Sequence, residues 1–160
     1  MSWEQVYEQW IDSDKLDEKM RKELQDLGKD RELKKDAFYK QLEFGTAGMR
    51  GVLGPGVNRM NIFTIRQATE GLARFMDTQD PETKRRGVAI AYDSRHMSPE
   101  FAMEAAKTLA KHDIPSFVFE SLRPTPELSF AVRFENAFTG IMITASHNPA
   151  EYNGYKVYGE

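Results

Sequence analysis

The feature that most constrains the fold is an alternation of short apolar runs with helix-like segments in the second half of the chain. The apolar runs are VAIAYD (88–93), SFVFE (116–120) and GIMITA (140–145). Each has the length and composition of a buried strand. Strands that alternate with helices are typical of parallel sheets joined by right-handed crossovers. We therefore predict an α/β fold with a mainly parallel, mixed sheet flanked by helices, and we expect a helix rather than a hairpin turn after each strand.

The two segments between these runs each start with a pair that suits a helix N-cap and first turn. The pairs are Ser98-Pro99, which opens a helix to about His112, and Thr125-Pro126, which opens one to about Phe134. A further helix is expected after Asn61, because apolar residues recur there at helical spacing. Its predicted apolar face consists of Ile62, Ile65, Leu72, Phe75 and Met76.

The first 42 residues are predicted to be an N-terminal helical arm. One apolar stripe at helical spacing is formed by Trp3, Val6, Tyr7, Trp10 and Ile11, and a second by Leu16, Met20, Leu24 and Leu27. Ser2 with Gln5 offers a capping box for the first helix. Gly28 is placed to end the second helix in a left-handed conformation. We assign residues 1–42 to the arm and residues 43–160 to the α/β domain.

Composition changes sharply after the arm, where residues 43–61 carry five glycines and one proline. Within this stretch, FGTAGMRG (44–51) has glycines that let the backbone approach an anion, and Arg50 suits a bidentate phosphate contact. The pattern matches neither the Walker loop nor the dinucleotide-binding motif, so a plain glycine turn is the alternative interpretation.

Charge and composition exclude several classes of protein. The formal net charge is -3, which gives no general basic field for nucleic acid. The chain has no cysteine, so it has neither disulfides nor thiolate metal ligands, and the reducing cytoplasm is the expected compartment. No run of about eighteen apolar residues occurs, and we expect no association with a membrane.

Polar residues gather in ITASHNPAEYNGYKVYG (143–159), directly after the last predicted strand. Ligands of open parallel sheets meet the loops beyond the carboxyl ends of the strands. Ser146 there has possible cationic and amide partners, which suits an oxygen that carries or accepts a phosphoryl group. The partners are His147, Asn148, Asn153 and Lys156. Asn148-Pro149 and Asn153-Gly154 are predicted turns that fold Lys156 back towards Ser146.

The serine and histidine of this loop also raise the alternative of a serine hydrolase. A serine hydrolase is disfavoured, because His147 adjoins Ser146 in the chain and the G-x-S-x-G elbow is absent.

In YDSRHMS (92–98) an ion pair between Asp93 and Arg95 is expected to shape the cleft, and His96 is expected to be a loop histidine. Five phenylalanines are predicted to be core residues: Phe117, Phe119, Phe130, Phe134 and Phe138.

Three motifs in order resemble those of the α-D-phosphohexomutases. TASHNPAEYNGYKVY is similar to the family's active-site serine loop, FGTAGMRG to its N-terminal motif, and YDSRHMS matches the segment between them. The resemblance covers roughly residues 40–160, and the arm is similar to that of the longer phosphoglucomutase and phosphopentomutase branch. It implies a phosphoserine enzyme that uses Mg²⁺ and moves phosphate between positions 1 and 6 of a hexose through a bisphosphorylated sugar, glucose 1,6-bisphosphate.

Carried over by motif, the resemblance implies that Ser146 is the phosphorylated residue and that its phosphate is a ligand of the metal. His147 and Lys156 match loop positions that contact the transferring phosphoryl group, with Lys156 the candidate for general acid or base assistance. Arg50 matches the arginine beside the phosphoserine, and Asn148 is expected to assist phosphate binding.

The chain departs from the family in length. Family members have further domains that carry an Asp-rich metal loop, a sugar-recognition loop and a distal phosphate site, and none of these motifs occurs here. The chain is therefore expected to be the first domain of a mutase, to work with the remaining domains of the same polypeptide on a sugar phosphate, and to be inactive alone. The alternative is a non-catalytic phosphosugar-binding or regulatory module that retains the serine loop.

Overall fold

The computed structural model describes residues 1–45, 48–121 and 125–159, and the side chains of Thr125 and Pro126 are not described. Thr46 and Ala47 of the FGTAGMRG motif thus lie outside the described residues. The elements are α1 (Trp3–Ile11), α2 (Glu18–Leu27), α3 (Arg31–Phe38), β1 (Met49–Val52), α4 (Ile62–Asp77), α5 (Pro81–Arg86), β2 (Val88–Tyr92), α6 (Ser98–Ala110), β3 (Ser116–Val118), α7 (Thr125–Phe134), β4 (Thr139–Ile143) and β5 (Tyr152–Tyr158).

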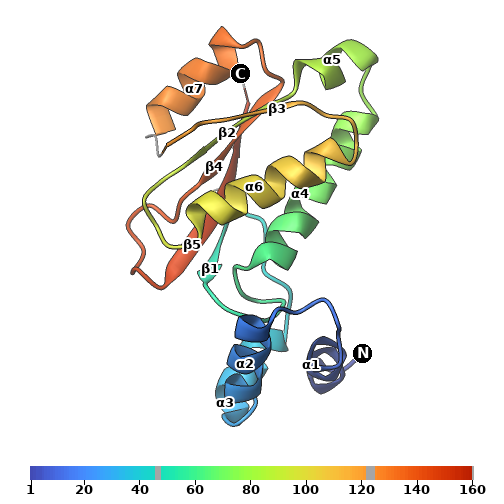
Figure 1. The fold of residues 1–160 in the computed structure, drawn as a ribbon, viewed down its shortest axis with the longest axis vertical. Coiled ribbons are helices and arrows are strands. Elements are labelled where there is room, and N and C mark those ends of the chain that lie inside the picture. Colours follow the sequence, from blue (N-terminus) through green and yellow to red (C-terminus); the bar gives the residue numbers. More distant parts are fainter. Residues whose placement is uncertain (46–47, 122–124, 160) are drawn as a thin grey trace.

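The five strands form one mixed sheet in the order β1-β5-β4-β2-β3. The three predicted strands are β2, β3 and β4, and β2 pairs in parallel with both of the others. β5 runs antiparallel to β4 and to β1. Helices α4 and α6 cover one face of the sheet and α7 covers the other, as Figure 1 shows. The predicted α/β fold, with a mixed sheet flanked by helices, is confirmed.

Two cores follow from this arrangement, one on each face. The larger one lies between the sheet and the helices α4 and α6, and it includes Ile90, Ile143 and Tyr155. The smaller one joins α7 to the opposite face, where Ala89 and Met142 pack against Leu128. Alternate residues of β2 and β4 thus point to opposite faces and nearly all are buried, as expected for central strands covered on both sides.

The strand β5 corrects two predictions. The predicted turn at Asn153-Gly154 lies inside this strand, and β4 leads into a hairpin rather than a helix. A Cβ at Gly154 would collide with the carbonyl oxygen of Thr144 and lie 2.9 Å from that of Met49, so the glycine is required by close packing of three backbones. Asn153 is fully buried. The two turn-forming residue types therefore serve tertiary contacts here.

The glycine-rich segment also contains a strand. Met49–Val52 forms β1, which pairs with residues 152–155 of β5. The N–H groups of Gly45 and Gly48 donate to each other's carbonyl oxygens over 3.0 Å in both directions. These two amides are already hydrogen-bonded, so the interpretation of the motif as an anion-binding backbone loop gains no support from them, and its contribution to the site is the side chain of Arg50.

Helix ends were predicted with mixed success. The capping box of Ser2 and Gln5 is present. Gly28 ends α2 in a right-handed conformation, with φ −62°, so the predicted left-handed cap is wrong. Close packing accounts for a glycine at this position, because a Cβ there would collide with the hydroxyl of Tyr7.

Helix α6 also begins differently from the prediction. Its N-cap is Met97, which has a left-handed backbone with φ 70° and makes no side-chain capping bond. Ser98 is the first helical residue, and its hydroxyl donates to Oδ1 of Asp93 over 2.9 Å instead of capping the helix. The serine therefore ties the helix to the loop after β2.

Several predicted core aromatics are exposed. Phe119 and Phe138 pack against the two cores, but Phe117, Phe130 and Phe134 are exposed, and so is Phe75 of α4. In α7 the residues Leu128, Ala131 and Val132 occupy the inward face. Phe130 and Phe134 are four residues apart, share the outward face, and stack with their ring centroids 5.6 Å apart.

The arm has a small core of its own, formed by Tyr7, Leu24, Ala37 and Phe38. It joins the rest of the molecule through Asp36, whose carboxylate accepts from Nη2 of Arg59 over 2.7 Å, and through the edge-on contact of Trp10 with Phe63. The arm helices lie at one end of the molecule, away from the sheet (Figure 1). Within the described ranges, no helix has the length and apolar character needed to cross a membrane.

Candidate active site

Ser146 lies in the loop of residues 144–151 between β4 and β5, here called the serine loop. The side chain is exposed, and the residue has a left-handed backbone with φ 55°. Its N–H donates to Oγ1 of Thr144 over 3.0 Å. A non-glycine residue in this conformation costs on the order of 1–3 kcal/mol, and it persists only where neighbouring contacts hold it. The serine is thus presented to solvent by a strained turn at the carboxyl edge of β2 and β4.

Lys156 is the nearest partner of the serine hydroxyl. It lies on β5 opposite Met142 of β4, and its Nζ donates to Oγ of Ser146 over 2.9 Å. Partial burial of the ammonium group lowers the pKa of Lys156, and the positive charge of Arg50 lowers it further. A lysine with a lowered pKa next to a hydroxyl is suited to exchange a proton with it.

Arg50 and Asn148 extend the site across the edge of the sheet. Arg50 on β1 stands opposite Gly154 of β5, two residues from Lys156, so both cationic side chains leave the same face of the sheet. Nη1 of Arg50 donates to Oδ1 of Asn148 over 3.3 Å. The structure therefore brings Ser146, Lys156, Arg50 and Asn148 together, as the sequence led us to expect.

His147 is the predicted site residue that the structure leaves apart. Its side chain is exposed, and it forms no hydrogen bond or ion pair with any residue that the structure describes. It follows Ser146 directly in the chain, and its side chain faces solvent. It is therefore available to a ligand but has no contact with the serine hydroxyl.

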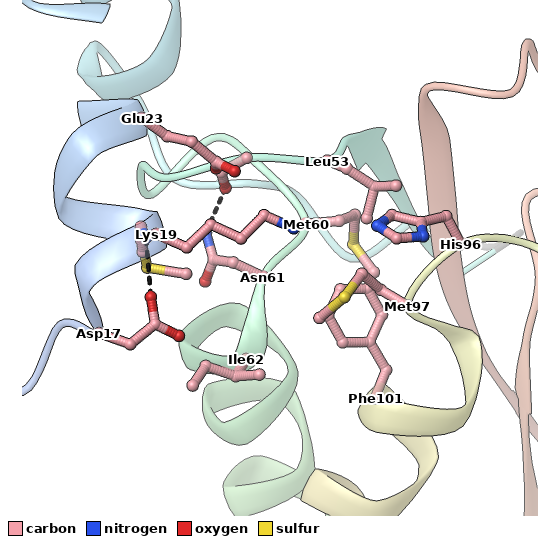
Figure 2. A pocket seen from close by; sticks show the side chains of 12 residues that line it. Asp17, Lys19, Glu23, Leu53, Met60, Asn61, Ile62, His96, Met97 and Phe101 are labelled. Atoms are coloured by element: carbon pink, nitrogen blue, oxygen red, sulfur yellow. Dashed lines mark hydrogen bonds between the residues drawn. The ribbon is translucent and has the colours of Figure 1, made fainter. Parts of the chain in front are cut away.

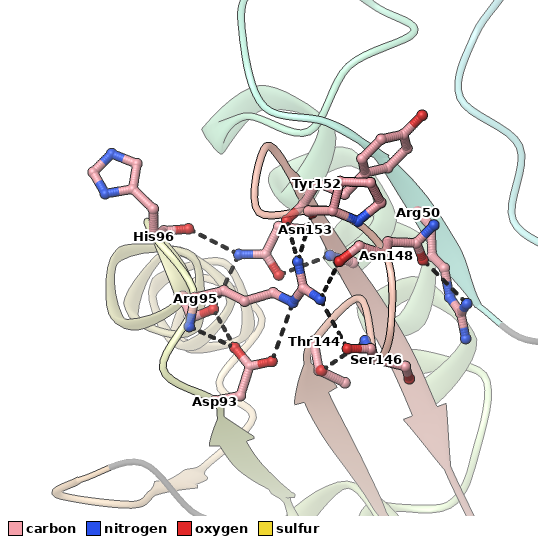
Figure 3. A network of polar contacts seen from close by, with 12 residues as sticks. Arg50, Asp93, Arg95, His96, Thr144, Ser146, Asn148, Tyr152 and Asn153 are labelled. Carbon is pink, nitrogen blue, oxygen red and sulfur yellow. Dashed lines mark hydrogen bonds and ion pairs between the residues drawn. The ribbon is translucent and has the colours of Figure 1, made fainter.

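The serine loop rests on a network that comes from the segment after β2 (Figure 3). Arg95 donates to four backbone carbonyl oxygens, those of Ser146, Asn148, Pro149 and Tyr152. The ion pair of Asp93 and Arg95 that the sequence predicted is present, with Nε 3.6 Å from Oδ2. The sequence predicted this ion pair, but it did not predict the four hydrogen bonds that Arg95 donates to the loop.

Asn153 was predicted to be an amide partner of Ser146, and this prediction is wrong because its side chain is buried and bonded to other residues. Its Nδ2 donates to the carbonyl oxygen of His96 and to Oγ of Ser98, each over 3.0 Å, and its Oδ1 accepts from the N–H of Gly154. The side chain thus links β5 to the first turn of α6. An asparagine followed by glycine is a strong turn signal, and this signal concealed the packing role.

A cavity of about 270 Å³ lies between α2 and the first turns of α4 and α6. Figure 2 shows the side chains of His96, Met97 and Phe101 on one wall and Lys19 on the arm side. None of the residues that were predicted for the site lines this cavity. It is a separate feature, although the backbone of His96 belongs to the network below the serine loop.

The described residues offer no ready metal centre. No group of three or more His, Asp or Glu side chains among them could hold a metal ion. The side chains within contact of Ser146 are instead a lysine and a threonine, with an arginine and an asparagine beside them. This donor set suits an anion such as a phosphoryl group.

The fold and the site together define a class: an α/β domain that presents a serine hydroxyl, paired with a lysine, at the carboxyl edge of a mixed sheet. Residues 41–160 match the family model described as phosphoglucomutase/phosphomannomutase, alpha/beta/alpha domain I. The chain therefore belongs to the phosphoglucomutase/phosphomannomutase family and carries its domain I.

Relatives and solved structures agree with this assignment. The chain is 51% identical over 125 residues to a phosphoglucomutase of Staphylococcus aureus (strain bovine RF122 / ET3-1), covering 78% of this chain and 22% of the relative. It is 45% identical over 151 residues to a phosphoglucomutase of Staphylococcus epidermidis, covering 94% of this chain and 27% of the relative. The chain thus spans about a quarter of the length of these curated relatives.

Among solved structures, one from Thermus thermophilus, described as a candidate phosphomannomutase, aligns with a TM-score of 0.66 and 32% identity over 75% of this chain and 26% of that chain. A phosphoglucomutase/phosphomannomutase family protein from Burkholderia thailandensis aligns with a TM-score of 0.55 and 25% identity over 72% of this chain and 25% of that chain.

Proposed function

We propose that this chain is the catalytic-serine domain of a phosphoglucomutase-type enzyme, in which Ser146 alternately carries and gives up a phosphoryl group. The observation that carries the proposal is the hydrogen bond of 2.9 Å from Nζ of Lys156 to Oγ of Ser146. A serine hydroxyl is a weak nucleophile and its alkoxide a poor leaving group, so a proton donor and acceptor at this atom is what phosphoryl exchange requires.

The proton balance of the exchange can be written with Lys156 alone. When phosphoserine reacts, a sugar hydroxyl attacks phosphorus, the new sugar O–P bond forms and the bond from Oγ of Ser146 to phosphorus breaks. Lys156 gives its ammonium proton to the departing Oγ and takes up the proton that the sugar hydroxyl loses. In the reverse step, Oγ of Ser146 attacks phosphorus and the bond from the sugar oxygen to phosphorus breaks, while Lys156 takes up the proton of Ser146 and gives one to the departing sugar oxygen. The lowered pKa of Lys156 makes its neutral form more accessible.

The remaining site residues are proposed to bind the phosphoryl oxygens. Arg50 lies beside Asn148, and both lie at the same edge as Ser146, so they can meet the equatorial oxygens of a group in transfer. His147 is exposed next to the serine and is proposed to contact the same group. Phosphoryl transfer depends chiefly on positioning and on neutralising this charge.

Mg²⁺ fits this site only through the phosphate. Mg²⁺ prefers oxygen ligands, and a phosphate on Ser146 would supply one, whereas the described residues contain no group of three or more His, Asp or Glu for a metal. We propose that its other ligands come from outside the described residues. When bound, the ion would neutralise charge on the phosphoryl oxygens.

The whole activity is proposed to need a longer polypeptide. The curated relatives are phosphoglucomutases of which the chain covers only 22% and 27%. We propose a hexose 1-phosphate and hexose 6-phosphate as the exchanged substrates, and glucose 1,6-bisphosphate as the intermediate. Positioning of the substrate accounts for roughly 7–11 kcal/mol of barrier reduction in effective-molarity estimates, so the chain alone is proposed to fold without mutase activity.

The test is the mutase activity of serine variants in the full-length polypeptide. Ser146→Ala removes the hydroxyl, and Ser146→Gly removes it while permitting the left-handed backbone. Both are expected to abolish turnover of glucose 1-phosphate in a coupled assay without lowering the melting temperature. Ser94→Ala, an exposed serine on the loop after β2, is the matched control and should keep full activity. Turnover by either Ser146 variant would overturn the proposal, and wild-type protein without any turnover would favour a non-catalytic phosphosugar-binding module.

A further inference from the structure

We propose that Arg95 is the positioning residue of the serine loop, which holds Ser146 within hydrogen-bonding distance of Lys156 without touching substrate. The catalytic part of this inference rests on the proposed function. The structural part, that Arg95 fixes the shape of the loop, stands on the contacts alone.

The contacts of Arg95 span the whole loop. Nη2 donates to the carbonyl oxygens of Ser146 over 2.8 Å and of Asn148 over 2.7 Å. Nη1 donates to those of Pro149 over 2.9 Å and of Tyr152 over 3.1 Å. One guanidinium therefore joins the residue of the nucleophile to the first residue of β5, and Figure 3 shows the four carbonyl groups converging on it.

This convergence explains why a strained serine stays in place. Four carbonyl dipoles that point at one position repel each other unless a cation lies there. A guanidinium has donors in a planar fork that can serve all four, whereas an ammonium group has only three donors on a single atom. Since the carbonyl of Ser146 is one of the four, Arg95 directly restrains the residue whose backbone has φ 55°.

Arg95 is itself held, and both of its terminal nitrogens, Nη1 and Nη2, already donate to the loop. Its side chain is 14% exposed, and its Nε faces Oδ2 of Asp93 at 3.6 Å. Oδ1 of Asp93 accepts from the N–H of Arg95 over 3.0 Å and from Oγ of Ser98 over 2.9 Å. Asp93, which lies between β2 and α6, thus holds the guanidinium in place. Arg95 therefore couples the position of Ser146 to the positions of β2 and α6.

Hydrogen exchange of backbone amides tests the structural part without reference to activity. In the loop, the N–H of Asn148 donates to the carbonyl of Ala145 and that of Tyr152 to the carbonyl of Pro149. In Arg95→Lys and Arg95→Ala these amides should exchange at least about tenfold faster, while amides of β2 and β4 keep wild-type rates. Loop exchange that stays within about twofold of wild type would overturn the inference.

The matched control is Arg86→Lys. Arg86 also donates from its guanidinium to two backbone carbonyls, those of Asn136 and Ala137, but it lies before β2 at the opposite edge of the sheet. Its replacement should leave exchange in the serine loop unchanged. Equal acceleration of the loop in this variant would show a general loss of stability and would also overturn the inference. If Arg95→Ala fails to fold, Arg95→Lys decides the result.

Kinetics of the full-length enzyme test the catalytic part. Arg95→Ala should lower kcat by about a hundredfold, because a displacement of about 1 Å at the reacting atoms has this effect, while KM changes by less than about threefold. Guanidinium ion at millimolar concentration should restore at least about tenfold of the lost rate in Arg95→Ala and none in Ser146→Ala. Unchanged kcat, or a loss that guanidinium leaves unrestored in a folded variant, would contradict the positioning role. Absence of wild-type turnover would refute the proposed function and leave the exchange result to decide the role of Arg95.

Discussion

Lys156 donates a hydrogen bond to the hydroxyl of Ser146 over 2.9 Å, across the hairpin that joins β4 to β5. The pairing of Met142 with Lys156 fixes the lysine near the end of β4, just before the serine loop. Strand register therefore fixes the position of Lys156, whereas the position of Ser146 depends on the conformation of the serine loop. A site built in this way needs only the loop itself to be held in shape.

Replacement of Lys156 should slow the reaction more than it weakens binding. In the full-length enzyme Lys156→Ala is expected to lower kcat by a factor on the order of a hundred or more, because the proton at Oγ of Ser146 loses its donor and acceptor. Lys156→Arg keeps the positive charge but cannot release a proton near neutral pH, so it should fail equally. Steady-state kinetics measure both, and a change confined to KM would assign Lys156 to binding alone.

Removal of the charge of Arg50 should move the pH dependence of the reaction. The pKa of Lys156 is lowered first by burial and second by Arg50, so Arg50→Gln is expected to raise it. The limb of the profile of kcat/KM against pH that reports the titration of Lys156 should then shift to higher pH, whether or not the maximal rate changes. Arg85→Gln on α5 is the control and should leave the limb in place. A shift to lower pH would contradict the electrostatic account.

Much of the fold followed from residue patterns. The alternation of apolar runs with capped helical segments predicted β2, β3 and β4 and the helices between them, because these elements are fixed by local periodicity. The strand β5 could not be predicted in this way, since it contains a turn-forming pair whose roles depend on tertiary contacts. Gly154 packs against the backbones at Thr144 and Met49, and Asn153 donates to the carbonyl of His96 and the hydroxyl of Ser98. Likewise, the outward stacking of Phe130 on Phe134 depends on which face of α7 meets the sheet.

The site was more predictable than its support. Ser146, Asn148 and Lys156 could be proposed because polar side chains after an apolar strand gather at one edge of the sheet, and Arg50 because it follows the glycines of FGTAGMRG. The four carbonyl contacts of Arg95 could not, since backbone acceptors leave no signature in the sequence. The left-handed backbone of Ser146 was equally hidden, because serine has no strong preference that would reveal it.

Two glycines of the molecule should respond in opposite ways to alanine. Gly154→Ala would push a methyl group into the carbonyl oxygens of Thr144 and Met49, and is expected to reduce the free energy of unfolding by more than about 2 kcal/mol. Gly71→Ala on the exposed side of α4 meets no atom within 4 Å and should increase it by about 0.5–1 kcal/mol. Urea unfolding measures both, and a neutral Gly154→Ala would mean that β5 does not pack as described.

Stability should depend on pH through His112, which joins the end of α6 to α4. Its Nδ1 lies 2.6 Å from Oδ2 of Asp77 and its Nε2 lies 2.8 Å from Oε1 of Glu70, while Lys84 and Arg74 pair with the same carboxylates. The hydrogen bonds to Asp77 and Glu70 raise the pKa of His112 above its usual 6.5. The pKa of Asp77 is lowered mainly by its hydrogen bonds with Lys84 and His112. The pKa of Glu70 is lowered mainly by its hydrogen bonds with His112 and Arg74.

The sign of this effect follows from the directions of the shifts. A histidine with a raised pKa stabilises the fold fully below about pH 6.5, and this contribution is lost as the pH rises through the folded value. The two carboxylates stabilise above about pH 4.5 and lose their contribution as the pH falls. His112→Gln should therefore destabilise the protein most between these limits and least at about pH 9, as measured by urea unfolding at each pH. A difference that grows towards pH 9 would show that His112 stabilises the fold in its neutral form.

The central claim is that Ser146 itself carries the phosphoryl group, and mass spectrometry of the phosphorylated peptide tests it most directly. Full-length enzyme is incubated with glucose 1,6-bisphosphate and Mg²⁺ and digested with trypsin, which releases the peptide of residues 134–156. The account predicts the added mass of one phosphate, localised by fragmentation to Ser146 rather than to Thr139 or Thr144, and its loss when glucose 1-phosphate is added in excess. Phosphate on another residue, or rapid mutase turnover with Ser146 never phosphorylated, would contradict it.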